Sequence, residues 1–207
     1  MKISIILGHP DPASFNHAIA QKIAHALAEA GAELRFHDLH AEGFDPILPA
    51  GEYARGAELP PLVARHCEEI RQADGLVLVH PNWWGMPPAI LKGWVDRVLR
   101  PGVAYEFLPG DNGEGVPAGL LKPMTALVFN TGNTPAERER EVFGDPLERL
   151  WRDCILSFCG VKRVVRRLYG VVCTSSAAQR AAWLEDAVAL ARSEFQERPS
   201  ALCNPKE

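Results

Sequence analysis

The sequence predicts a doubly wound α/β domain, a three-layer sandwich whose five-stranded parallel sheet has the order 2-1-3-4-5 with helices on both faces. Two observations predict it. Short apolar runs alternate along the chain with longer segments of helical periodicity. The runs are continuously apolar, which is typical of parallel strands covered on both faces. Five strands, each followed by a helix, imply right-handed crossovers, for which 2-1-3-4-5 is a usual order.

The strands are expected at Ile3–Leu7, Glu33–Leu39, Gly75–Val79, Met124–Phe129 and within Lys162–Val172. Apolar residues at helical spacing predict helices over Phe15–Ala30, Pro60–Ala73, Ile90–Leu99, Leu147–Phe158 and Ala177–Phe195. Segment 45–60 lacks periodicity, and segment 108–119, with four glycines and two prolines, is expected to be a mobile loop. We therefore expect a single domain over residues 1–197, followed by a disordered tail over residues 198–207.

Composition argues against several classes of function. The net charge of −4 provides no basic field for a nucleic acid. No apolar run approaches the roughly 18 residues that a membrane span needs, and the N-terminal apolar stretch is too short for a signal peptide. We therefore expect a cytoplasmic protein that does not insert into membranes.

The five cysteines, Cys67, Cys154, Cys159, Cys173 and Cys203, are odd in number and form no C-x-x-C pair. Most lie among apolar residues, so we expect reduced core thiols rather than a disulfide framework or a zinc ribbon. His37 and His40 lack an obvious third ligand, and no metal site is expected.

Ligands of such sheets bind at the carboxyl ends of the strands, near the point where the strand order reverses. Three loops leave those ends, and the first is GHPDPASFN at residues 8–16. It matches neither a dinucleotide fingerprint nor an NTP-binding loop. It offers His9, the Ser14 hydroxyl, the Asn16 amide and the N–H groups of a helix start, a donor set that suits a phosphate. The alternative is that Ser14 only caps its helix.

The second loop is HPNWWGMPP at residues 80–88. Two adjacent tryptophans cannot both point into one side of a core, so at least one is expected to face a cleft or another chain. A flat aromatic ligand would supply the missing contact area, while Gly85 permits a close backbone approach. A dimer interface or an ordinary core tryptophan remains the alternative.

The third loop is NTGNTP at residues 130–135, whose small donors and glycine form either a concavity of N–H groups or an ordinary turn. Together the loops offer a phosphate end, an aromatic wall and a polar edge. A flavin mononucleotide moiety has these three parts, which makes a flavin the predicted cofactor.

Several motifs resemble the NAD(P)H:quinone reductases, the DT-diaphorase family within the flavodoxin-like fold. PNWWGMPPAILKGWVDRV is similar to the segment after strand 3 of that family, and its ILKGW part is highly specific. HPDPASFNHAI resembles the family's phosphate loop, LVFNTGN the loop after strand 4, and AYEF an aromatic stretch that lines the active site of the partner subunit. LSFCG is a further match, and the similarity covers about residues 1–170.

The resemblance implies a role for each matching residue. The cofactor phosphates would bind at His9, Ser14, Phe15, Asn16 and Ala18. The isoalloxazine ring would lie against Pro81, Asn82, Trp83, Trp84 and Gly85, and its pyrimidine edge against Asn130, Thr131, Gly132 and Asn133. Tyr105 and Phe107 would wall the substrate pocket of the opposite subunit in a homodimer. The cofactor would be FAD or FMN, with FAD slightly preferred, and NAD(P)H would be the hydride donor.

One departure concerns the tyrosine and histidine that well-known members carry beyond the strand 4 loop. Here Arg138 falls near the tyrosine position and Phe143 near the histidine position, within AEREREVFGDP. We therefore expect Arg138, with Trp84 and Tyr105, among the catalytic residues, its guanidinium facing the reduced flavin or the quinone oxygen. The alternative is a solvated helix face, since AERERE alternates acidic and basic residues.

The predicted function is two-electron reduction of quinones by NAD(P)H through a ping-pong mechanism. Hydride chemistry belongs to the flavin, and the protein contributes positioning, with the backbone of residues 130–133 stabilising negative charge. The alternatives are an azo- or nitro-reductase with the same flavin, or a regulatory flavoprotein subunit of a potassium-efflux system. An electron-carrier flavodoxin fits less well, because those chains are usually shorter and more acidic.

Overall fold

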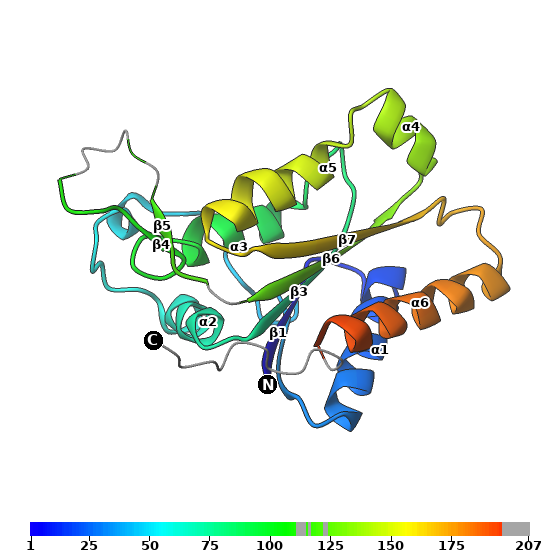
Figure 1. The fold of residues 1–207 in the computed structure, drawn as a ribbon, viewed down its shortest axis with the longest axis horizontal. Helices are drawn as coiled ribbons and strands as arrows, with labels where there is room; N and C mark the ends of the chain where they lie inside the picture. Colours follow the sequence, from blue (N-terminus) through cyan, green and yellow to red (C-terminus); the bar gives the residue numbers. More distant parts are fainter. Residues whose placement is uncertain (111–114, 116, 122–123, 196–207) are drawn as a thin grey trace, which may run out of the picture.

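The computed structural model describes residues 1–110, 115, 117–121 and 124–195; the predicted tail at residues 198–207 and part of the predicted loop at residues 108–119 lie outside them. Its main sheet is parallel, with the order β2-β1-β3-β6-β7 (Figure 1). The strands are β1 (Lys2–Leu7), β2 (Glu33–Asp38), β3 (Gly75–Pro81), β6 (Thr125–Gly132) and β7 (Arg163–Gly170). Counted along the chain, this is the predicted order 2-1-3-4-5, and the fold prediction is confirmed.

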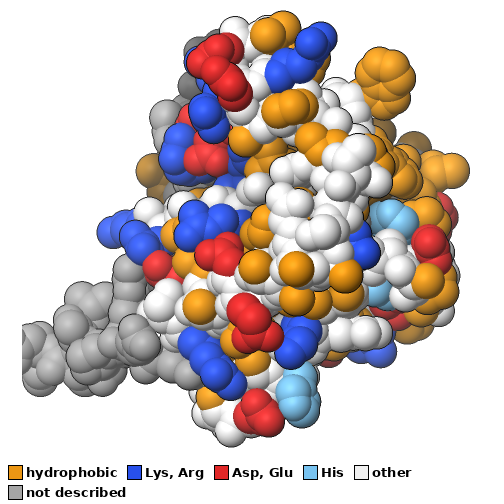
Figure 2. Space-filling view, turned by 90° about the vertical axis from the view of Figure 1, so that its right-hand side faces the viewer, with side chains coloured by type: hydrophobic (Ala, Val, Ile, Leu, Met, Phe, Trp, Pro, Cys, Tyr) orange, Lys and Arg blue, Asp and Glu red, His pale blue; other side chains and the backbone are white. Residues whose placement is uncertain are grey.

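Helices cover both faces of the sheet. Helices α1 (Phe15–Glu29) and α6 (Ala177–Phe195) pack on one face; α2 (Pro61–Arg71), α3 (Ala89–Val98) and the segment formed by α5 (Pro146–Glu148) and the π-helix η2 (Arg149–Leu156) pack on the other. Helices α1 and α6 begin on the right-hand side of Figure 1, where the short helix α4 (Ala136–Glu141) also lies. Figure 2 views the molecule from that side and shows hydrophobic side chains interspersed with charged ones.

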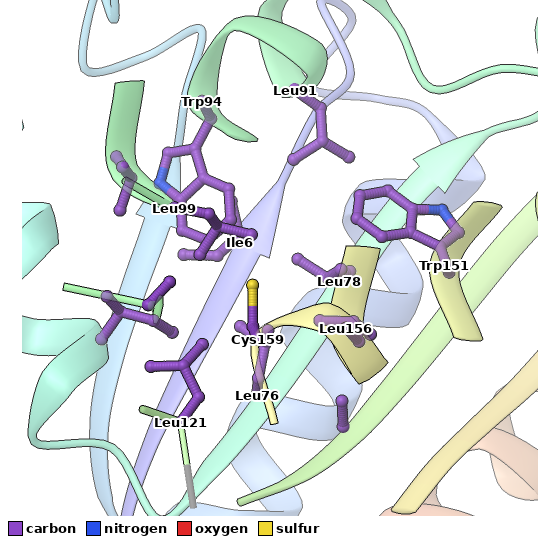
Figure 3. Close-up of a cluster of buried hydrophobic side chains, with 14 of the residues drawn as sticks. Ile6, Leu76, Leu78, Leu91, Trp94, Leu99, Leu121, Trp151, Leu156 and Cys159 are labelled. Carbon is purple, nitrogen blue, oxygen red and sulfur yellow. The ribbon is translucent and has the colours of Figure 1, made fainter. Parts of the chain in front are cut away.

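The core has two parts because every central strand is buried on both faces. Ile3, Ile5 and Leu7 of β1 pack toward α1 and α6, while Ile6 packs toward α2 and α3. Figure 3 shows the second part, in which Trp94 of α3 and Trp151 of η2 approach the same sheet face as Leu78. Successive side chains along a strand therefore point to opposite faces of the sheet. The same alternation applies at the end of β6.

Helix α3, which contains the ILKGW motif, is fixed by a close backbone contact and by hydrogen bonds of its side chains. A Cβ on Gly93 would lie 2.3 Å from the Cα of Pro46, so only glycine permits this approach. Trp94 Nε1 donates a 2.9 Å hydrogen bond to His66 Nδ1. Arg97 is buried and its Nε donates to Glu52 at 3.0 Å. The helix therefore holds the irregular segment at residues 45–60, which contains the short 3-10 turn η1 (Ala50–Glu52), against the sheet.

Two local features differ from the sequence prediction. A two-stranded antiparallel sheet pairs β4 (Tyr105–Glu106) with β5 (Ala118–Gly119), and β5 falls within segment 108–119, where only a loop was expected. Cys67 and Cys159 are buried thiols as predicted, but Cys154 and Cys173 are exposed. Within the described residues, no helix has the length and apolar character that a membrane crossing requires.

Candidate functional site

Two adjoining cavities lie at the carboxyl edge of the sheet, where the strand order reverses between β1 and β3. The larger has a volume of about 420 Å³ and the smaller about 370 Å³. Asn82, Gly132, Asn133 and Thr134 line both, so the cavities form one continuous groove. None of the described residues that line the groove is a lysine or an arginine.

The smaller cavity is built on the first turn of α1. His9, Ser14, Phe15 and Asn16 line it, and the N–H groups of Phe15 and Asn16 have no hydrogen-bond partner among the described residues. Such free amides at the start of a long helix favour an anion. Burial is the main cause that lowers the pKa of His9, which keeps that ring neutral near pH 7.

Ser14 caps α1 and is held by a chain of hydrogen bonds. Its Oγ accepts from the backbone N–H of His17 at 3.3 Å and lies 2.9 Å from Nδ1 of the His17 ring. His17 Nε2 lies 2.9 Å from the carboxylate of Asp38. An ionised carboxylate only accepts, so the His17 ring donates to it from Nε2. The Ser14 hydroxyl is therefore fixed at the cavity wall by its cap and by the ring.

Asn16 supplies the clearest sign that the smaller cavity takes a polar ligand. Its side chain is 2% exposed, and its Nδ2 donates to Thr131 Oγ1 at 2.9 Å. Its Oδ1 is buried and has no hydrogen-bond partner among the described residues. Since a buried polar atom without a partner costs about 1–3 kcal/mol, this oxygen is suited to a donor that arrives with a ligand.

The two tryptophans face different cavities. Trp83 lines the smaller one and Trp84 the larger. A turn separates them: the Trp83 and Met86 backbones exchange two 3.1 Å hydrogen bonds, and Asn82 Oδ1 accepts from Gly85 N at 2.9 Å. Trp84 adopts a φ of 59° and its side chain is 98% exposed. A residue of this size in the left-handed region is held there by its turn, and its indole is left open to a partner.

The larger cavity is walled by residues from three loops. Trp84, Phe143 and Pro146 supply apolar surface, and Glu139 of α4 supplies a carboxylate. A Cβ on Gly85 would lie 2.7 Å from Cγ of Pro146, so these two loops touch only because residue 85 is glycine. This cavity offers flat apolar walls with one acidic group.

A buried polar network lies beneath both cavities. The His80 ring is fully buried: its Nδ1 lies 2.8 Å from the Pro81 carbonyl, and its Nε2 accepts from Trp151 Nε1 at 2.9 Å. Burial lowers the pKa of His80 to about 4, so the ring is neutral with its proton on Nδ1. Asn130 Nδ2 donates to the same Nε2 at 2.8 Å.

Arg166 connects this network to the wall of the larger cavity. Its guanidinium donates to Asn130 Oδ1 at 3.0 Å, to Glu148 at 2.7 Å and to the carboxylate of Asp145. Asp145 precedes Pro146, which lines the cavity. The buried arginine therefore ties the loop at residues 143–146 to the end of β6.

Most of the predicted cofactor residues come together in the groove. The lining includes His9, Ser14, Phe15, Asn16, Pro81, Asn82, Trp83, Trp84, Gly85, Thr131, Gly132 and Asn133. Two others do not line it. Ala18 lies in the second turn of α1, its N–H bonded to the Ser14 carbonyl, and Asn130 directs its side chain into the network beneath.

The three residues predicted for catalysis lie in different places. Trp84 lines the larger cavity. Arg138 is exposed on α4, with its guanidinium carbon 5.5 Å from the centre of the Phe143 ring, and does not line the cavity. Tyr105 packs against Phe107 and Phe158 in the β4–β5 region, at the other end of the molecule from α4 (Figure 1). Neither Tyr105 nor Phe107 lines either cavity of its own chain.

Sequence reasoning missed part of the lining. Thr134, Glu139, Phe143 and Pro146 line the larger cavity, and Val172 and Cys173 the smaller. The loop after the fifth strand was a findable signal, because every loop at the carboxyl edge is a candidate. No sequence signal distinguished Glu139, because acidic and basic residues alternate in the AERERE segment as they do on a solvated helix.

A second group of histidines and acids lies outside the groove. His37, Glu42 and His66 have potential ligand atoms within 4.8 Å of one another. The bonds already present oppose a metal there: Trp94 donates to His66 Nδ1, so His66 carries its proton on the Nε2 that faces Glu42 at 3.1 Å. Burial lowers the pKa of His66 to about 3. The group instead joins α2 to the end of β2.

Comparisons with known proteins agree with this geometry. A family model described as flavodoxin-like fold matches residues 1–191. A Haemophilus influenzae protein named as an NAD(P)H oxidoreductase is 35% identical over 210 residues, covering 98% of both chains. The rat ribosyldihydronicotinamide dehydrogenase (quinone) is 28% identical over 221 residues, covering 96% of this chain and 94% of the relative.

Solved structures give the same result. An NAD(P)H:quinone oxidoreductase from Methanothermobacter marburgensis matches with a TM-score of 0.80 and 26% identity, covering 96% of this chain and 99% of that one. An azoreductase from Bacillus anthracis shares the fold, with a TM-score of 0.74 and 18% identity. The chain belongs to the family of flavodoxin-like fold, in which its relatives are named NAD(P)H oxidoreductases and quinone dehydrogenases.

Proposed function

We propose that this protein is a flavin-dependent NAD(P)H oxidoreductase that reduces quinones by two electrons. The observation that carries the proposal is the divided groove, with anion-binding amides and the unpaired Asn16 oxygen in one cavity and the flat aromatic walls of Trp84 and Phe143 in the other. The relatives named as quinone dehydrogenases support it.

The residues present fit the parts of a flavin mononucleotide, which FMN and FAD share. The first turn of α1, with Ser14 and Asn16, would hold the phosphate and polyol. The N–H groups of Asn133 and Thr134 have no hydrogen-bond partner among the described residues and line both cavities, so they would face the polar edge of the ring. A bound flavin would supply the hydride chemistry between NAD(P)H and the acceptor.

The chain's own contribution is positioning and the exclusion of water. Trp84 would lie against the ring and, with Phe143, wall the space above it, where the nicotinamide and the acceptor bind in turn, giving ping-pong kinetics. The donors at Asn133 and Thr134 would stabilise negative charge at the polar edge, since fixed dipoles act strongly in a site with little water. Arg138 remains a proposed source of positive charge at the mouth of this cavity.

A homodimer completes this proposal. Trp84 and Phe143 are 98% and 50% exposed at the cavity mouth, and burying such aromatic surface is favourable. A two-fold mate would close the cavity, with its own Tyr105 and Phe107 as further walls. Light scattering should report a dimer at micromolar concentration, and a monomer would contradict this part.

The test of the function uses purified protein in two assays. Heat-released cofactor is run against FMN and FAD standards, and turnover is then measured with NADPH or NADH and a benzoquinone. A flavin together with quinone turnover supports the proposal. Flavin without quinone turnover, but with reduction of an azo dye or a nitroarene, would favour the alternative reductase. Flavin with no turnover of any acceptor would favour a regulatory role.

A further inference from the structure

Glu139 is placed unlike the other charged residues of its helix. Helix α4 spans Ala136–Glu141, and its other charged residues, Glu137, Arg138, Arg140 and Glu141, are exposed. Glu139 is 5% exposed and lines the larger cavity. Its backbone is fixed on both sides, since its N–H donates to the Pro135 carbonyl at 3.1 Å and its carbonyl accepts from Asp145 N at 2.8 Å.

The carboxylate of Glu139 has no hydrogen-bond or ion-pair partner among the described residues. The other buried acids contrast with it: Glu52 is paired with Arg97, and Glu194 with Arg163. Once a ligand fills the cavity, a carboxylate without a partner is unfavourable, because it loses water and gains nothing in exchange. An unpaired acid at a cavity wall therefore indicates that its partner arrives with the ligand.

Arg138, next to Glu139 in the chain, and Arg166, which binds the wall of the larger cavity, are engaged elsewhere. The Arg138 guanidinium lies over the Phe143 ring, and Arg166 donates to Asp145, Glu148 and Asn130. Neither forms an ion pair with Glu139 in the part of the chain that the structure describes. Among the described residues that line the larger cavity, no lysine or arginine offsets the negative charge of Glu139.

We propose that Glu139 determines the specificity of the larger cavity, selecting flat aromatic acceptors that carry a hydrogen-bond donor or a positive charge and rejecting anionic ones. This inference rests on the proposed function, in which the acceptor stacks in that cavity. A carboxylate accepts an N–H or O–H from a ligand edge, and that bond is strong because the acceptor is ionised. An anionic ligand meets repulsion and leaves the carboxylate without a partner.

The test compares two naphthoquinones of similar size, one with a trimethylammonium group and one with a sulfonate. Their dissociation constants are measured on the oxidised flavoprotein from changes in the flavin absorption spectrum, without turnover. The wild type should bind the cationic compound about tenfold or more tightly than the anionic one, and high salt should reduce the ratio. Glu139→Gln keeps the shape and should bring the ratio within about twofold.

Glu141→Gln is the matched control, because Glu141 lies on the same helix and is exposed. It removes the same charge from the protein and should leave the ratio near that of the wild type. Equal ratios in the wild type and in Glu139→Gln would overturn the inference, even where NADPH still reduces the flavin and quinones still turn over. Protein that binds flavin but neither naphthoquinone would overturn both the inference and the proposed quinone site.

Circular dichroism and the flavin content of each variant check that it has the same fold as the wild type. Should Glu139→Gln fail to fold, Glu139→Asp tests the same point, because it keeps the charge and withdraws it by one methylene. The charge preference should then persist at a reduced ratio. An unchanged or inverted ratio in Glu139→Asp would overturn the inference.

Discussion

The two cavities that meet at Asn82 and Gly132 are built in different ways. The smaller rests on a helix start, and the side chains of Ser14 and Asn16 are fixed by hydrogen bonds to neighbouring residues. The larger is walled by the tip of one loop and by the segment at residues 139–146, with Trp84 and Phe143 exposed. A rigid cavity suits a group that is always the same, and a cavity made by loops suits a ligand that varies.

The largest expected effect on the free energy of unfolding comes from Arg166, which joins the two regions. Arg166→Met leaves the carboxylate of Asp145 without its partner and Asn130 Oδ1 without its donor, and it leaves Glu148 with Arg152 alone. Breaking a buried ion pair costs about 3–5 kcal/mol, and the partial exposure of both acids favours the lower end. Urea unfolding measures the loss.

The control for that variant is Arg167→Met, on the same strand, where the side chain is exposed and pairs with Asp186. It should change the free energy of unfolding by less than about 1 kcal/mol. Arg166→Met should also weaken ligands of the larger cavity more than it weakens flavin binding. Equal losses in the two variants would show that the network beneath the cavities does not tie the wall to β6.

The next effect is a dependence of stability on pH. Burial lowers the folded-state pKa of His80 to about 4 and that of His66 to about 3, below the ordinary value of 6.5. At a pH between the folded-state and the ordinary pKa, the unfolded chain therefore binds more protons than the folded chain. The contribution of the two rings to the free energy of unfolding is fully present above pH 6.5 and falls as the pH drops toward 4. Each ring should cost about 1.4 kcal/mol per pH unit in that window.

Unfolding free energies at pH 7.5, 6.5, 5.8 and 5.2 measure this slope. His80→Gln removes one of the two rings and should reduce the slope by about one proton, whatever it does to the stability at pH 7.5. A slope that does not change in His80→Gln would contradict the assignment of His80 as a neutral buried ring.

A smaller effect is expected at the rigid cavity. Ser14→Ala removes the cap of α1 and should lower the free energy of unfolding by about 1 kcal/mol. It should also weaken flavin binding, because the hydroxyl lines the proposed phosphate site. Ser176→Ala is the matched control: Ser176 Oγ accepts from Gln179 N at 3.1 Å at the start of α6, and Ser176 lines neither cavity. A similar stability loss with unchanged flavin affinity is expected there.

The fold was predictable from the sequence because each element carries its own pattern. Continuous apolar runs specify strands covered on both faces, and the rule that ligands bind at the carboxyl edge brought the three loops together. The two strands of the β4–β5 sheet were not predictable, since two residues are too few for any periodicity. The contact of Gly85 with Pro146 is likewise a tertiary contact that no local pattern records.

The candidate site was predictable as a set of loops but not side chain by side chain. Four consecutive residues from Asn130 to Asn133 were expected to face the cofactor, yet neighbours at the end of a strand point to opposite faces, and Asn130 faces the network below. The AERERE segment resembles a solvated helix, and five of its residues are exposed, while Glu139 is not. Which residue of so short a helix is buried depends on where the loops place it.

The smallest expected effect on stability is at Trp84. Its replacement should change flavin binding without changing the free energy of unfolding appreciably. The indole is 98% exposed, so Trp84→Ala removes almost no buried surface and should change the free energy of unfolding by less than about 0.5 kcal/mol. The backbone strain stays, because alanine at a φ of 59° is disfavoured much as tryptophan is. Flavin affinity, measured by fluorescence quenching of added flavin, should instead fall by about 1–3 kcal/mol, the value of burying one aromatic face.

Met86→Ala, in the same turn and 54% exposed, is the matched control and should change neither the free energy of unfolding nor the flavin affinity appreciably. Unchanged flavin affinity in Trp84→Ala would remove this residue from the cofactor wall and leave its exposed indole to the proposed dimer contact, which the oligomeric state of the same variant then tests.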